Sequence, residues 1–415
     1  MKKKVFLLLL PLVMSLVSCG KDVSPNMDKI DLARLLSNDE INEALDKIED
    51  NFVNKLSGME VNLAMIYDDL VDQKKETTMS GSLKIKGDEY AESNAEMTTK
   101  VQNSFYTYTD KQVTNNKVAA FGEYYISMNE SYKDGKKDDK TQLIDFDDKD
   151  GETIVQTCTN LPFDEDDIED ATVGVDKRDN IYIVYSEETI ITKEGHDKDG
   201  KDATFIDKTT YEISGKLGSL KDPKVESYKI VRKMESNYDK QLKIYKDYQL
   251  VESNVVSYKF EYKNYGKNDG KDKFINSLPE HFIGAGEVFA NAYTKLEGES
   301  NYSIVSSNML NLSSSKINYD AGTYFAKLNN YQLNKNYAYT FDGVYSLITL
   351  DKSNQEIIFE DRQCDKFDLT ASEDVIIETV NNVKYFKLKE NYNSSVADFE
   401  FTIGLNDNRL SVVAL

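Results

Sequence analysis

Few side chains in this 415-residue sequence are of the types that carry out nucleophilic, redox or metal chemistry. The cysteines and histidines are Cys19, Cys158, Cys364, His196 and His281. Neither Cys158 nor Cys364 has a cysteine or histidine close to it in sequence, so neither belongs to a zinc or thiol-redox motif. Two alternatives stay open for them outside the cytoplasm: one long-range disulfide, or two separate idle thiols, which we favour. The histidines are far apart, so we expect surface roles rather than a shared metal site.

Acidic runs are the other place where an ion could bind. The stretches around Gly151 and Gly200 have aspartates at some calcium-loop positions, but they lack the residues that open and close an EF-hand loop. Residues 164–170, DEDDIED, offer carboxylates to a hard cation, although a solvated loop is the favoured interpretation. The motifs of hydrolases, zinc proteases, P-loop proteins and dinucleotide-binding proteins are missing from the sequence. We therefore expect no enzyme, no catalytic residue, no cofactor and no metal site.

The N-terminus carries the one group to which a specific modification can be assigned. Three lysines at positions 2–4 precede an apolar run at 5–17, which is too short to span a bilayer and suits a signal peptide. The run ends in Leu16-Val17-Ser18-Cys19, which resembles the lipobox of bacterial membrane lipoproteins. That resemblance implies removal of residues 1–18 and linkage of the Cys19 thiol to a diacylglycerol. The alternative is an ordinary signal peptide with an accidental cysteine.

The lipobox resemblance also predicts a location. Two or more acyl chains, palmitate among them, would hold the chain on the extracytoplasmic face of the cell membrane, as part of the cell envelope. The net charge of −22 argues against a nucleic-acid partner, because no basic stripe is available to displace counterions. The same charge keeps the protein body off an anionic membrane surface, so the expected contact with the membrane is the lipid at Cys19 alone.

Periodicity predicts one capped helix followed by many strands. After a tether at 19–36, Ser37 and Glu40 form a capping box, and apolar residues recur at helical spacing until Gly58. Period-two alternation then predicts strands of an antiparallel sheet at 59–67, 117–128, 181–191, 241–250 and 254–262. The turn signals are the Asp-Gly pairs at 134–135, 150–151, 199–200 and 269–270. With 27 tyrosines, 18 phenylalanines and only five prolines, the composition also favours strands.

A second S-x-x-E box, Ser277 and Glu280, predicts a second helix over 277–298. Apolar residues of the two helices coincide at several offsets from the serines, and strands are predicted again afterwards at 317–328, 336–341, 343–350, 356–360, 384–389 and 397–405. The expected class is α+β, mostly β, with a capped helix and a curved antiparallel sheet that occur twice. The expected domains are 37–265 and 271–415. The alternative is that two capped helices of similar length match by chance.

Two functions suit a tethered chain of this kind. The helix-plus-meander plan distantly resembles the lipoprotein-carrier (Lol-type) class, which implies a helix–sheet cavity for an apolar or lipid-like ligand. The aromatic-rich stretches at 100–130 and 317–341 would suit such a cavity, with Phe105 among its lining residues. The alternative is a displayed structural or adhesion-type module with a dry core, whose partner would be a surface protein or a polymer. Neither function is enzymatic.

Overall fold

The computed structural model describes residues 31–68, 73–134, 141–161, 163, 168, 171–239, 242–263, 270–313, 325–328, 331–364, 368–371, 373–404 and 409–414. Most of these residues lie in antiparallel strands, with few helices, which confirms the expected mostly-β, α+β class. The signal peptide, the lipobox and Cys19 lie outside the described residues, so lipidation stays a prediction. The acidic run at 164–170, apart from Ile168, also lies outside them.

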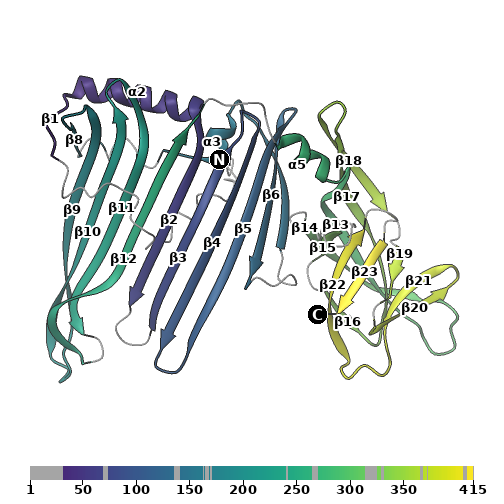
Figure 1. Ribbon diagram of the computed structural model, residues 1–415. Coiled ribbons are helices and arrows are strands. Elements are labelled where there is room, and N and C mark those ends of the chain that lie inside the picture. The colour runs from purple at the N-terminus through teal and green to yellow at the C-terminus, as the bar shows by residue number, and fades with distance from the viewer. Residues whose placement is uncertain are drawn as a thin grey trace. The chain divides into compact units, whose positions relative to one another are not determined.

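The chain folds as two compact units (Figure 1). The first contains residues up to 120, 130–140 and 149–271, and the second contains 121–129, 141–148 and 272–415. Two short segments, 121–129 and 141–148, therefore belong to the second unit, although the chain returns to the first unit after each of them. All residues after Lys271 belong to the second unit. The sequence did not indicate these two segments.

The first unit is built on very long strands. Its elements are β1 (Arg34–Leu35), α2 (Asn38–Lys55), β2 (Leu56–Asp68), β3 (Gln73–Ile85), β4 (Tyr90–Asn103), β5 (Thr107–Phe121), α3 (Ile154–Cys158), β8 (Thr172–Val175), β9 (Asn180–His196), β10 (Asp202–Ser219), β11 (Asp222–Asp239) and β12 (Ile244–Tyr262). They form a sheet in the order β1-β8-β9-β10-β11-β12-β2-β3-β4-β5. Most of β6 (Tyr124–Lys133) and all of β7 (Thr141–Asp148) belong to the second unit.

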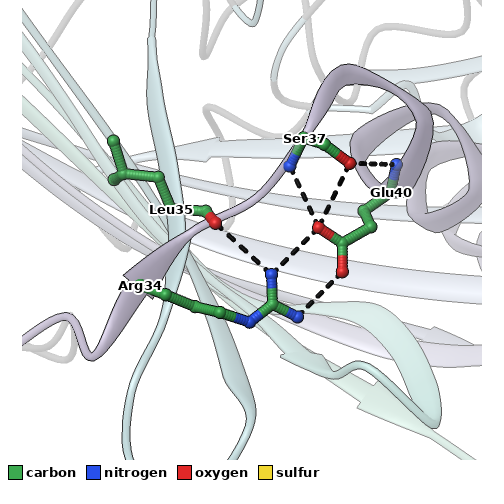
Figure 2. Close-up of polar contacts among 4 residues, drawn as sticks. All are labelled: Arg34, Leu35, Ser37 and Glu40. Atoms are coloured by element: carbon green, nitrogen blue, oxygen red, sulfur yellow. Dashed lines mark hydrogen bonds and ion pairs between the residues drawn. The ribbon is translucent and has the colours of Figure 1, made fainter.

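The predicted capping box begins α2 (Figure 2). The Ser37 hydroxyl accepts a hydrogen bond from the backbone N–H of Glu40, while the Glu40 carboxylate accepts one from the backbone N–H of Ser37. Arg34 donates to both oxygens of the same carboxylate, at 2.9 and 2.8 Å. The hydrogen bonds from Arg34 hold the pKa of Glu40 down at about 2. One carboxylate thus fixes the start of the helix to the strand that precedes it.

The long sheet has one apolar and one polar face, as its period-two pattern predicts. The apolar face, called here the helix face, packs against α2 through Phe52 and Phe260, whose ring centroids are 5.8 Å apart. On the opposite face, pairs such as Lys259 and Glu60 bridge neighbouring strands in solvent. Strict alternation along antiparallel strands therefore buries one side of the sheet and leaves the other wet.

The second unit contains a smaller, more irregular sheet. Beside the short helix α5 (Lys271–Ser277) it has β13 (His281–Thr294), β14 (Ser303–Ser313), β15 (Phe325–Leu328), β16 (Tyr331–Asn334), β17 (Ala338–Asp351), β18 (Glu356–Cys364), β19 (Asp368–Thr370), β20 (Val375–Val380), β21 (Val383–Leu388), β22 (Val396–Gly404) and β23 (Arg409–Ala414). Its core includes the fully buried Val288, Phe341, Phe386 and Phe399. Gly343 allows β13 to come close, because a Cβ there would lie 2.3 Å from the carbonyl oxygen of Glu287.

The predicted second helix at 277–298 is wrong. Its centre is strand β13, which pairs with β14 and β17, and Ser277 ends α5, where its hydroxyl donates to the carbonyl of Phe274. Val288, Ala290 and Ala292 are buried at a period of two. The glycines at 284 and 286 each destabilise a helix by about 1 kcal/mol relative to alanine. Hydrogen bonding to a neighbouring strand on each side stabilises the strand instead. The proposed repeat of a helix and a meander therefore fails in its second copy.

Smaller expectations also need correction. The predicted strand at 117–128 is a hairpin, β5 and β6, that turns at Gly122, whose φ is +57°. Conversely, 241–250 and 254–262 fall largely in one strand, β12, as 336–341 and 343–350 do in β17. Of the Asp-Gly pairs, the pair at 199–200 forms a β hairpin turn, whereas the pair at 150–151 precedes α3.

Candidate binding surface at the distal end of the long sheet

The helix face of the first unit is filled at one end of its strands. There Tyr228 is completely buried and contacts Phe163, with ring centroids 5.3 Å apart, while α3 buries Ile154, Val155 and Cys158. Burial raises the pKa of Tyr258, on the neighbouring strand, to about 12. A dry core of this kind occupies the end where α2 lies, called here the helix end (Figure 1).

The opposite end, called the distal end, exposes aromatic side chains. At the turn between β4 and β5 the exposed fractions are 93% for Phe105, 53% for Tyr106 and 50% for Tyr108. The two tyrosine rings stack, with centroids 5.9 Å apart and planes inclined by 25°. These three residues form what we call the aromatic tip. So much apolar surface in one place usually marks a contact site.

Hydrogen bonds within the turn hold the aromatic tip in place. The side-chain oxygen of Asn103 accepts from the backbone N–H groups of both Phe105 and Tyr106, each at 2.8 Å. The backbone N–H of Asn103 in turn donates to the carbonyl of Tyr106 at 3.0 Å. An asparagine before the turn is the residue type that closes such a structure. The rings are therefore presented by an ordered turn, which lowers the entropy cost of binding.

The aromatic tip continues onto the helix face as a row across the strands. Strand register aligns Tyr67, Lys75, Val101 and Tyr108, one from each of β2 to β5, so their side chains share one face. Tyr67 is 39% exposed, whereas Val101 is buried at 2%. The row thus carries tyrosines at both ends, separated by three strand spacings, or about 14 Å.

A polar row lies beside it, two residues closer to the helix end. It consists of Asn254, Met65, Thr77, Thr99 and Asp110 from β12, β2, β3, β4 and β5. The hydroxyls of Thr77 and Thr99 are 3.1 Å apart. The Asn254 side-chain oxygen has no hydrogen-bond partner among the described residues, and Asp110 lies 3.8 Å from the Lys133 ammonium group. Thr77 is only 2% exposed, and the Asn254 side-chain oxygen and one Asp110 carboxylate oxygen are buried, so this row is covered and forms part of the interior of the sheet face.

A second aromatic cluster stands at the distal end of β10 to β12. Phe205 stacks on Tyr238 at 5.1 Å and on Tyr245 at 6.4 Å. Lys193 lies over the Phe205 ring and pairs with Asp207 at 2.5 Å. All of these residues are at least partly buried except Lys193, so this cluster acts as a small core that holds the tip of the strands together.

The chemically reactive residues singled out in the sequence do not meet in the described residues. His196 ends β9, highly exposed, and pairs with Asp202 at 3.0 Å, while His281 begins β13 and bonds the Thr349 hydroxyl. Cys158 lies in α3 and Cys364 ends β18, and both are free cysteines, not joined in a disulfide. No cluster of three metal-ligating side chains occurs in the part of the chain that is described.

Phe105 was expected to line a cavity and instead is almost fully exposed, so that assignment is wrong. Residues 104–106 form the turn between β4 and β5, so their side chains do not follow the alternation of a strand that would turn them toward the helix face. Sequence reasoning noticed the aromatic stretch but missed Asn103, Tyr67 and Asn254. One signal was available: an Asn-Ser pair directly before two aromatic residues, in a stretch without charge.

Among the described residues, no helix has the length and apolar character needed to cross a membrane. Comparison with known proteins gives no family model that matches the chain and no match among curated proteins.

Proposed function

We propose that this chain is a non-enzymatic binding protein, anchored by lipid at Cys19 to the extracytoplasmic face of the membrane, which presents the distal end of its long sheet to a partner. The observation that carries the proposal is the exposure of Phe105, 93%, on a turn held by Asn103. An ordered, exposed phenylalanine does not add to the stability of a fold, whereas its burial against a partner adds to the free energy of binding.

The direction in which the chain enters the first unit supports display. Arg34 and Leu35 pair with β8, and α2 follows at once, so the chain enters at the helix end (Figure 1). The strands are long: the 18 residues of β10 span about 60 Å. Residues 19–30 reach at most about 40 Å when extended. A lipid at Cys19 would therefore hold the helix end near the membrane and leave the aromatic tip free to point outward.

The carrier hypothesis has less support. It needs an apolar cavity between helix and sheet, yet at the helix end that space holds Phe52, Ile154 and Phe163, all buried. Lipid transport stays a prediction, and the displayed module is the function that this geometry favours.

Anchoring and binding can be tested separately. We expect labelled palmitate to be incorporated into the full-length precursor in the producing bacterium, and not into the Cys19→Ser variant. For binding, the mature chain from residue 19 with Cys19→Ser is mixed with isolated cell envelopes. We expect saturable binding that falls at least tenfold in a variant with Phe105→Ser, Tyr106→Ser and Tyr108→Ser.

The matched control is Phe359→Ser, which removes an aromatic ring of similar exposure, 50%, from β18 in the second unit. Its binding should equal that of the parent chain. Absence of saturable binding, or equal binding by the triple variant and the parent, would contradict the proposed function.

A further inference from the structure

The kind of partner can be inferred from the aromatic tip, and this step rests on the proposed function. We infer that the partner is the surface of a lipid bilayer, into which the tip inserts Phe105 while Tyr106 and Tyr108 stay at the level of the headgroups. The proposed lipid at Cys19 leaves the tip pointing outward, so this bilayer is one that faces the anchored chain. Three properties of the tip lead to a bilayer: its exposed rings, its lack of charge and its internally paired backbone.

The exposure of the rings is the first property. Phe105 is 93% exposed, so almost nothing in the fold covers it, and Tyr106 and Tyr108 are about half exposed. Such a ring leaves water only in a partner that surrounds it, and acyl chains can surround a ring in any orientation. Tyrosine, with an apolar ring and a polar hydroxyl, is enriched where acyl chains meet headgroups. A phenylalanine beside two tyrosines therefore matches the depth profile of a bilayer surface.

The aromatic tip lies in an uncharged stretch of a strongly acidic protein. Residues 101–109 have no charged side chain, although the net charge of the chain is −22. Lys100 and Asp110, which bound this stretch, have opposite charges. Insertion of a charged group among acyl chains is costly, and the stretch avoids that cost. Anionic lipids would repel the acidic body of the protein, so a bilayer of neutral lipids fits best.

The turn already pairs backbone groups that would lose water in a membrane. The N–H groups of Phe105 and Tyr106 both donate to the Asn103 side-chain oxygen at 2.8 Å, and the N–H of Asn103 donates to the carbonyl of Tyr106 at 3.0 Å. Polar backbone groups are costly to bury among acyl chains unless they are hydrogen-bonded within the protein. These three donors can therefore leave water without losing their hydrogen bonds.

A pocket in a protein partner is the alternative. Such a pocket could also hold Phe105, but a protein interface usually adds hydrogen bonds around its apolar centre. The backbone donors of Asn103, Phe105 and Tyr106 are used within the turn, and residues 101–109 offer no charge to a partner. The tip therefore offers such an interface little beyond its rings, which are sufficient for a bilayer.

The chain contains no tryptophan, which allows a direct test. In the mature chain with Cys19→Ser, the variant Phe105→Trp has a single tryptophan, so its fluorescence reports the surroundings of position 105 alone. We expect the emission to shift to shorter wavelength when phosphatidylcholine vesicles are added, and to be quenched by lipids brominated on their acyl chains. Three rings bind more weakly than one long acyl chain, so lipid concentrations of about 1–10 mM are needed.

The matched control is Phe359→Trp, at a ring of 50% exposure in β18, whose emission should not change with vesicles. In sedimentation with the same vesicles, the variant with Phe105→Ser, Tyr106→Ser and Tyr108→Ser should bind about tenfold more weakly than the Cys19→Ser chain. Phosphatidylglycerol mixed into the vesicles should weaken binding severalfold at low salt, and about 500 mM NaCl should remove that difference, because salt screens the repulsion.

Persistent binding to cell envelopes, with no shift or quenching of the Phe105→Trp emission by phosphatidylcholine vesicles, would overturn the bilayer and leave the proposed function intact, with a protein as partner. An equal change in Phe359→Trp would refute insertion at the aromatic tip. Stronger binding to vesicles that contain phosphatidylglycerol would overturn the neutral bilayer. Failure of envelopes to bind the chain at all would instead refute the proposed function itself, so the two failures are distinguishable.

Discussion

Replacing Gly215 by alanine tests the packing of the helix face. Gly215 lies in β10 between Ile183 of β9 and Tyr228 of β11, and both side chains are completely buried. A Cβ at this position would lie 2.7 Å from Cδ2 of Tyr228 and 2.9 Å from Cγ2 of Ile183. Neither neighbour can move into solvent, so the strand must shift.

Overpacking of this kind costs about 1–3 kcal/mol, and the stiffer backbone of alanine returns about 0.5–1 kcal/mol. We therefore expect Gly215→Ala to destabilise the first unit by about 1–2 kcal/mol. The control is Gly195→Ala in β9, where the nearest atoms would be 3.5 Å away, at Phe205 and Tyr245. That variant should be neutral or stabilised by up to about 1 kcal/mol.

The chain has two units that need not unfold together, so a local measurement is preferable to one melting curve. Hydrogen exchange of peptides from β10 and β11, followed by mass spectrometry, reports the opening free energy of this part of the sheet. Faster exchange in Gly215→Ala, with unchanged or slower exchange in Gly195→Ala, is the expected result. Equal exchange in the two variants would refute the packing argument.

Three further predictions follow from charges, thiols and the helix start. Burial, with Asp145 and Asp148 nearby, raises the pKa of Asp147 to about 6, so its ionised form destabilises the fold above that pH and the effect disappears below pH 4. Asp147→Asn should therefore raise the melting temperature at pH 7.5 but not at pH 4. An equal gain at both pH values would contradict this prediction. Burial raises the pKa of Cys158 to about 12, so a thiol reagent at pH 8 should modify Cys364 first and Cys158 only on unfolding. Equal rates of modification of the two thiols would be inconsistent with the fold. Ser37→Ala should destabilise the start of α2 by about 1 kcal/mol, seen as faster hydrogen exchange in its first turn. The control Ser104→Ala, in the turn after β4, should leave exchange in α2 unchanged. No effect of Ser37→Ala would mean that the helix does not need this cap.

Local signals in the sequence were sufficient where local forces decide the structure. The Ser37–Glu40 box predicted the start of α2, and alternation predicted β2 and β9, because one face of each strand is buried along at least part of its length. The same box at Ser277 failed because β13 is held by two neighbouring strands, which no local pattern encodes.

The candidate surface was predictable only in part. An aromatic stretch at 100–130 could be seen, but its orientation depended on the turn at Asn103. The alignment of Asn254 with Thr77 and Asp110 arises from strand register across segments far apart in the chain. Such registers are a property of the whole sheet, so single-sequence reasoning could not assemble the polar row.

The position of β2 has a consequence for how the first unit folds. β2 follows α2 directly and lies between β3 and β12, so its pairing is complete only after residues near the end of the unit have been synthesised. Ser57 and Glu261, which share a hydrogen bond, are 204 residues apart. At about 5–20 residues per second, synthesis of that stretch takes about 10–40 s. Contacts so distant in sequence make folding slow. During that interval one edge of β2 stays open, and its unpaired backbone groups are available for wrong pairing with another chain.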